Sequence, residues 1–174
     1  MGIDCYLHWK GQTEAEKRGQ VTGFSVTSGH AGYLREGYHG GPYATKVLIP
    51  EGWKSDDDDG VAIPAATLRA RLPATVLCAT YRNHVVYGQG TNPGVGQIED
   101  GNVLTVIAPL LAESRKGVQQ DELPTPSAEQ VRAVSVLIEK RHLPGYALAF
   151  VDFVLLAESK ERETGEPCRV YVSY

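Results

Sequence analysis

The sequence predicts a single α+β domain spanning residues 1–174, with an antiparallel or mixed sheet and helices packed mainly on one of its faces. Three observations support this fold class. Residues 2–9 alternate between apolar and polar side chains, as in a half-buried strand. Residues 127–141 begin with a capping box and continue as an apolar stripe, as in an amphipathic helix. Residues 168–174 alternate again, which indicates a second strand.

The composition is that of an ordinary globular protein. Of the 174 residues 42% are hydrophobic and 22% are charged, so a disordered chain is not expected. The net charge is −4 and the basic residues are scattered, which disfavours a nucleic-acid partner because phosphate contacts need clustered positive charge. The longest apolar run, 146–157, is too short to span a membrane. The three cysteines form no CxxC pair, so we expect buried thiols in a cytoplasmic protein.

The first half of the chain combines short strands with helices. Residues 13–16 form a capping box, which predicts a short exposed helix, and residues 21–27 suit a short strand. Residues 47–49 are apolar, and both a strand and the end of a helix remain open for them. Residues 64–87 are predicted to be helical, as one kinked helix or two consecutive helices, because Pro73 interrupts their apolar spacing.

The second half contains loops and a long apolar segment. Residues 88–102 are rich in glycine and are predicted to form a long loop, and residues 103–107 favour β structure. Residues 146–157 form a nearly continuous apolar run, which predicts a strand buried on both faces. We expect this strand to pair with residues 168–174 as an antiparallel hairpin across the charged loop 158–167.

Residues 28–46 are the strongest candidate for a ligand site. They hold five of the 19 glycines, three of the nine tyrosines and two of the five histidines. If residues 31–39 are helical, Arg35 and His39 share one face, and aromatic rings around them would suit a small anion. The alternative is a packing segment anchored by its tyrosines. The predicted ligand-binding residues are Tyr33, Arg35, Tyr38, His39 and Tyr43.

Three residues are candidates for acid–base catalysis. His30 and His39 are histidines in the segment 28–46, and histidine changes its charge near neutral pH. Asp152 lies in the apolar run, and a buried carboxylate needs a partner or a shifted pKa. Arg82 and His84 are candidates for that partner. A purely structural ion pair is the alternative interpretation of Asp152.

No motif in the sequence calls for a metal or a cofactor. His30 and His39 are nine residues apart, and no HExxH pattern occurs. The acidic run 56–59 lacks the later glutamate of a calcium loop, which favours a solvated turn. Residues 88–94 lack the Lys-Ser/Thr pair of a phosphate-binding loop, and no Gly-x-Ser-x-Gly is present. We therefore expect no metal site and no cofactor.

Two short motifs resemble a known group of proteins. Residues 1–6 read Met-Gly-Ile-Asp-Cys-Tyr and residues 32–35 read Gly-Tyr-Leu-Arg. This is similar to uncharacterised bacterial and phage proteins that open with Met-Gly-Leu/Ile-Asp-x-Tyr and carry a later Gly-Tyr-x-Arg. That group has no assigned activity, so the resemblance implies only a prokaryotic cytosolic accessory protein.

The sequence leaves three functions open. The first is a binding module without catalysis, which uses residues 28–46 for a small anionic ligand or a protein partner. The second is a small acid–base enzyme acting on an anionic small molecule, and the third is an immunity-like or regulatory protein-interaction module. A cavity that unites His30, Arg35, His39 and Asp152 would favour the enzyme, whereas a flat patch of tyrosines would favour the interaction module. A homo-oligomer is compatible with all three.

Overall fold

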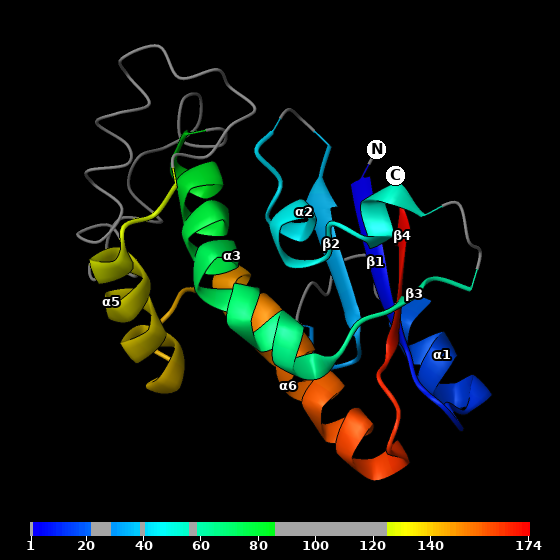
Figure 1. The fold of residues 1–174 in the computed structure, drawn as a ribbon. Helices are drawn as coiled ribbons and strands as arrows, with labels where there is room; N and C mark the ends of the chain where they lie inside the picture. Colours follow the sequence, from blue (N-terminus) through cyan, green and yellow to red (C-terminus); the bar gives the residue numbers. More distant parts are fainter. Residues whose placement is uncertain (1, 22–28, 39–40, 56–58, 86–124) are drawn as a thin grey trace.

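The computed structural model describes residues 2–21, 29–38, 41–55, 59–85 and 125–174, and their fold is α+β, as the sequence predicts. In chain order the elements are β1 (Gly2–His8), α1 (Glu14–Val21), β2 (Tyr33–Gly37), α2 (Ala44–Leu48), the 3-10 helix η1 (Gly52–Lys54), β3 (Val61–Ala62), α3 (Ala65–Val85), α5 (Ala128–Glu139), α6 (Gly145–Thr164) and β4 (Arg169–Ser173) (Figure 1). Of the strand predicted for residues 21–27, Val21 instead ends α1, and the rest lies outside the described residues, as do residues 56–58 and 86–124.

The four described strands form one antiparallel sheet in the order β2-β1-β4-β3. Strand β1 is central, with Tyr6 opposite Tyr33 of β2 on one side and opposite Tyr171 of β4 on the other. The short β3 pairs with β4, where Val61 lies opposite Val170. Neighbouring strands of the sheet are therefore far apart in the sequence, and tertiary contacts must bring them together.

The two faces of the sheet differ, because β1 keeps the predicted alternation. Ile3, Cys5 and Leu7 are fully buried, whereas the residues between them are half-buried. The buried face packs against the helical layer, in which α3 and α6 contact each other and α5 packs against α3 (Figure 1). The opposite face carries Tyr6 and Tyr171. The helices thus lie mainly on one face, as expected.

Helix α3 is one continuous helix that runs through Pro73. Proline removes a helical hydrogen bond, at a cost of about 3 kcal/mol in a helix interior. The cost is offset because Leu68, Leu72 and Val76 lie on one stripe and are completely buried in the core. Of the two alternatives predicted here, the single helix is therefore the one that forms over Ala65–Val85.

Both predicted capping boxes are confirmed. Ser127 Oγ accepts a hydrogen bond from the Gln130 amide at 3.2 Å, and the Gln130 side chain accepts one from the Ser127 amide at 2.7 Å. Before α1, the amide of Thr13 donates to Glu16 Oε2 at 2.7 Å, and the Glu16 amide donates to Thr13 Oγ1 at 3.2 Å. These contacts satisfy amide groups that a helix leaves unpaired at its start.

The prediction of a strand over residues 146–157 is wrong. These residues belong to α6, which begins after Pro144 and ends at Gly165 in the left-handed conformation. The apolar run is continuous because this helix is buried on several sides, which removes the usual amphipathic period. Residues 158–164, expected to form a loop, continue the helix. The expected hairpin does not form, and β4 pairs with β1 and β3 instead.

The helix considered for residues 31–39 is also absent, because Tyr33–Gly37 form β2. Gly29 and Gly32 adopt φ angles of 72° and 77°, a backbone region that favours glycine and breaks a helix. An added Cβ on Gly29 would lie 1.8 Å from the carbonyl oxygen of Ala149, so this turn packs directly on α6. Residues 47–49 prove to be the end of helix α2 and its C-cap.

Candidate functional site

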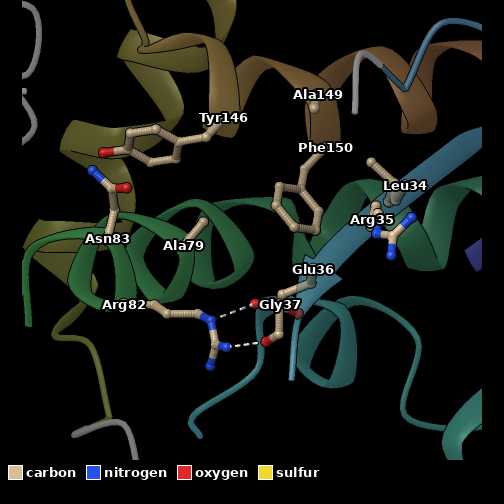
Figure 2. Close-up of a pocket in the computed structure, with 10 residues that line it drawn as sticks. All are labelled: Leu34, Arg35, Glu36, Gly37, Ala79, Arg82, Asn83, Tyr146, Ala149 and Phe150. Atoms are coloured by element: carbon tan, nitrogen blue, oxygen red, sulfur yellow. Dashed lines mark hydrogen bonds and ion pairs between the residues drawn. The ribbon is translucent and has the colours of Figure 1, made fainter. Parts of the chain in front are cut away.

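A cavity of about 120 Å³ opens between β2, α3 and α6 (Figure 2). Residues 34–37 of β2 form one wall, so the cavity lies at the segment that the sequence singles out. Its volume approaches that of a cavity of about 150 Å³ that holds benzene in another protein. Space for one small ring is therefore present at a place where a strand and two helices meet.

A buried ion pair between Glu36 and Arg82 closes one side of this cavity. The two side chains are 8% and 3% exposed, and Arg82 Nε lies 3.3 Å from Glu36 Oε1. Glu36 also accepts hydrogen bonds from the Ala44 amide at 2.9 Å, the Thr45 amide at 3.0 Å and the Thr45 hydroxyl at 2.6 Å. These donors lie at the start of α2, so the carboxylate replaces the missing cap of that helix.

Arg82 connects α3 to the chain that leads into α2. Its guanidinium donates to the carbonyl oxygen of Pro42 at 3.0 Å and to that of Gly37 (Figure 2 shows the contacts with Gly37 and Glu36). The guanidinium carbon also lies 4.6 Å from the centre of the Tyr43 ring, a cation–π arrangement. Arg82 therefore holds both ends of residues 37–42 in place.

The negative charge of Glu36 affects the pKa values of two buried thiols. Burial raises the pKa of Cys5 and Cys78, and the nearby carboxylate of Glu36 raises both pKa values further. Cys5, Cys78 and Cys168 are free and buried, as expected from the sequence. All three side chains are therefore protonated at neutral pH and are unsuited to act as nucleophiles.

The remaining walls are mostly apolar, and the Asn83 amide and the Tyr146 hydroxyl lie at one end. Phe150 and Ala149 of α6 face Ala79 of α3, and all three are nearly buried. Asn83 extends from α3 toward Tyr146 on α6, at the same end of the cavity (Figure 2). The Asn83 amide makes no hydrogen bond within the described part of the chain. The cavity thus combines apolar walls with one amide, a common pattern in small-molecule sites.

Tyr33 and Arg35, predicted to bind a ligand, meet Asp4 on the other face of the sheet. The Tyr33 hydroxyl donates to Asp4 Oδ1 at 2.5 Å, and Arg35 Nε lies 3.7 Å from the same oxygen. Burial, the hydrogen bond to Asp4 and the charge of Asp4 raise the pKa of Tyr33 well above its usual range. Gly2 leaves room for Arg35, because an added Cβ would lie 2.9 Å from Arg35 Nε. The two motifs at residues 1–6 and 32–35 therefore meet across β1 and β2.

Tyr38 and Tyr43 belong to a third place, a cluster with Trp53 and Tyr174 that we call the aromatic cluster. Tyr43 stacks on Tyr38 and on Trp53 with ring centres 5.6 and 5.3 Å apart, and Trp53 stacks on Tyr174 at 4.8 Å. Tyr38 is 43% exposed and Tyr174 is 65% exposed. Lys46 lies 5.7 Å from the centre of the Trp53 ring. The cluster presents stacked rings to solvent beside a positive charge.

The two catalytic candidates that the structure describes, His30 and Asp152, do not line the cavity. His30 is exposed in the turn before β2, and His39 lies outside the described residues. The Asp152 carboxylate is on α6 and pairs with Arg141 at 2.9 Å, so the expected partner Arg82 is not its partner. Among the predicted site residues Arg35 alone is part of the described cavity wall, and its guanidinium turns toward Asp4.

Sequence reasoning missed the residues that shape the cavity. Glu36 and Arg82 are 46 residues apart, and no local sequence pattern predicts that they form an ion pair. One signal was present, because Leu68, Thr75 and Arg82 repeat every seven residues and therefore lie on the same side of α3. Leu68 belongs to the apolar spacing that predicts this helix, so the repeat places Arg82 on the predicted buried side, and the structure shows Arg82 to be 2% exposed.

Within the part of the chain that the structure describes, no group of three or more His, Cys, Asp or Glu residues could hold a metal ion. No described helix is both long enough and apolar enough to cross a membrane. Comparisons with protein-family models, curated proteins and solved structures gave no match. The function must therefore be argued from the geometry.

Proposed function

We propose that this protein is a binding module without catalytic activity, which takes a small molecule into the cavity between β2, α3 and α6. One observation carries the proposal. The cavity has the volume of a small ring, apolar walls and an amide at its rim, and it lies on the segment 28–46. Small-molecule sites are concave and mostly apolar, with a few placed polar groups.

The state of Glu36 argues for binding without catalysis. It is the only carboxylate among the described wall residues, and it already accepts three hydrogen bonds and pairs with Arg82. A general acid or base must be able to exchange a proton with the substrate. Glu36 is committed to the start of α2 instead. The buried free thiols suit a reducing compartment, which fits the cytoplasmic location that we propose with this function.

The test fills the cavity and measures the binding of ring-sized probes. Ala79 is 6% exposed and lines the cavity, so Ala79→Leu places a large side chain in the space that a ligand would occupy. Ala70 is exposed on the same helix, and Ala70→Leu is the matched control. Benzene and 2-pyridone are titrated into each protein and followed by NMR. We expect binding by the original protein and by Ala70→Leu, and loss of binding in Ala79→Leu. Failure of both probes to bind the original protein would contradict the proposal.

The aromatic cluster favours a second candidate function, an interaction module with a protein partner. Tyrosine and tryptophan are enriched at protein interfaces, and the positive charge of Lys46 beside Trp53 suits an acidic partner segment. A random copolymer of glutamate and tyrosine is a suitable probe, with Trp53 fluorescence as the signal in a Trp9→Phe background. We expect a saturable change that is lost in Tyr38→Ala. An unchanged Trp53 signal would count against this candidate.

A further inference from the structure

The chemistry of the cavity rim is set by Asn83. Its side chain lines the cavity and makes no hydrogen bond within the described residues. An asparagine amide offers an N–H donor and a carbonyl acceptor side by side. Such an amide pairs best with a ligand edge that carries an acceptor next to a donor, as when asparagine recognises adenine. The rim is therefore complementary to a two-point edge and not to a single polar atom.

The shape of the cavity favours a flat ring. Phe150 contributes an aromatic side chain to the wall, and Ala79 and Ala149 are small enough to leave space opposite it (Figure 2). Aromatic rings pack in offset or edge-to-face arrangements against another ring. The volume of about 120 Å³ matches one six-membered ring more closely than a larger ring system.

The charges in the wall favour a neutral ligand. Glu36 and Arg82 are of opposite sign, lie 3.3 Å apart and are both buried, so they compensate each other. Arg35, the other cation in the wall, lies 3.7 Å from Asp4. The desolvation free energy of an ionised ligand in this cavity exceeds the electrostatic attraction that the wall offers, because each charge in the wall already has a partner of opposite sign.

Taking the cavity as the binding site proposed above, we propose that its ligand is a neutral, planar six-membered heterocycle with adjacent hydrogen-bond donor and acceptor groups. Asn83 recognises the two-point edge of the ring, and Phe150 packs against the ring itself. This class includes cyclic amides and the amide-like edges of nucleobases. It replaces the anion expected from the sequence, and it rests on the proposed small-molecule function.

The test compares four probes of similar size. 2-Pyridone carries the donor and the acceptor, N-methyl-2-pyridone keeps only the acceptor, benzene has neither, and benzoate is anionic. Dissociation constants are measured by NMR for the original protein and for Asn83→Leu, which keeps a similar size without the amide. We expect 2-pyridone to bind the original protein about tenfold more tightly than each of the other three. In Asn83→Leu the advantage of 2-pyridone over benzene disappears.

The outcomes separate the ligand class from the function. If benzene binds as tightly as 2-pyridone, or if the preference survives in Asn83→Leu, the proposed recognition is overturned and the small-molecule function stands. Tighter binding of benzoate overturns the neutral ligand in the same way. If no probe binds the original protein up to its solubility limit, both proposals fail. Circular dichroism of Asn83→Leu shows whether the variant is folded, and loss of benzene binding by a folded variant also counts against the recognition by Asn83.

Discussion

The buried pair of Glu36 and Arg82 makes the sharpest prediction about stability. Glu36→Gln keeps the size of the side chain and removes the negative charge that lies beside Arg82, a residue that is 2% exposed. Removing one member of a buried ion pair typically costs about 3–5 kcal/mol, because the other charge stays buried and uncompensated. We expect about 3 kcal/mol for Glu36→Gln, at the lower end of that range.

The lower end follows from the contacts that survive. The guanidinium of Arg82 still donates to the carbonyl oxygens of Gly37 and Pro42, and it still faces the Tyr43 ring. The glutamine carbonyl can accept part of the three hydrogen bonds that Glu36 accepts at the start of α2. For a chain of this length, about 3 kcal/mol corresponds to a fall in Tm of roughly 6–12 °C.

Urea denaturation of a double-mutant cycle measures the pair directly. The cycle combines Glu36→Gln, Arg82→Met and the double variant. We expect the double variant to be at least ~1 kcal/mol more stable than the sum of the two single effects predicts, because it removes both charges of the pair together. The matched control is Asp152→Asn, which breaks the pair with Arg141, where the side chains are 25% and 47% exposed.

The control is expected to cost less than ~1 kcal/mol, since water screens an exposed pair. The reasoning is refuted if Glu36→Gln costs no more than Asp152→Asn, or if the cycle gives no coupling between Glu36 and Arg82. Either result would mean that the pair contributes nothing beyond its separate hydrogen bonds.

Three further predictions concern local features. Gly165 ends α6 at a φ of 72°, and no atom lies near an added Cβ, so Gly165→Ala should lower the free energy of unfolding in urea by about 1–2 kcal/mol through backbone strain alone. Gly145→Ala, at the start of the same helix, is the control and should be neutral or stabilising. Equal effects of the two substitutions would contradict the role of the left-handed cap. Ser127→Ala should cost about 1 kcal/mol by the same measurement, and no loss would mean that the capping box adds nothing to α5. Burial raises the pKa of Cys168 to about 11, so the unfolded chain loses the thiol proton at a lower pH than the folded protein. The free energy of unfolding should therefore fall as pH rises from about 8.5 toward 11. A Cys168→Ala variant should show a smaller fall over the same pH range.

Local sequence patterns were sufficient to predict a helix or strand where one of its faces is buried and the other is exposed to solvent. The alternation in β1 and β4, with Cys5 and Val172 buried opposite each other, appears directly in the sequence. The same holds for the capping boxes at Thr13 and Ser127, because the partners are three residues apart. Such signals need no information about distant parts of the chain.

Local patterns failed where burial removes the contrast between two faces. Helix α6 is apolar on several sides, so its sequence from Tyr146 to Ala157 carries no helical period and suggests a buried strand. The length of the run and the charged residues that follow it were the available signals for a helix. Side-chain spacing likewise suggested a helix that included residues 33–37, which form a strand. The glycines before them, which favour a turn, were the available signal against this helix.

The candidate site shows the same division. Composition alone directed attention to residues 28–46, and β2 from that segment does form one wall of the cavity. The ligand-binding roles of Tyr33, Arg35, Tyr38 and Tyr43 stay predictions. The structure places the first two beside Asp4 and the last two in the aromatic cluster. The two groups are separate because Tyr33 and Arg35 share one face of β2, whereas Tyr38 and Tyr43 follow the end of this strand.

The sequence by itself determined the α+β class, the strand at residues 2–9, the two capped helices and the segment that borders the cavity. The tertiary structure alone decided that α6 is a helix, that β4 pairs with β1, and that Glu36 meets Arg82 at the edge of the cavity. The physical reason is the range of the interactions. Caps and alternating patterns act between near neighbours, whereas strand pairing and buried ion pairs join residues that only the folded chain brings together.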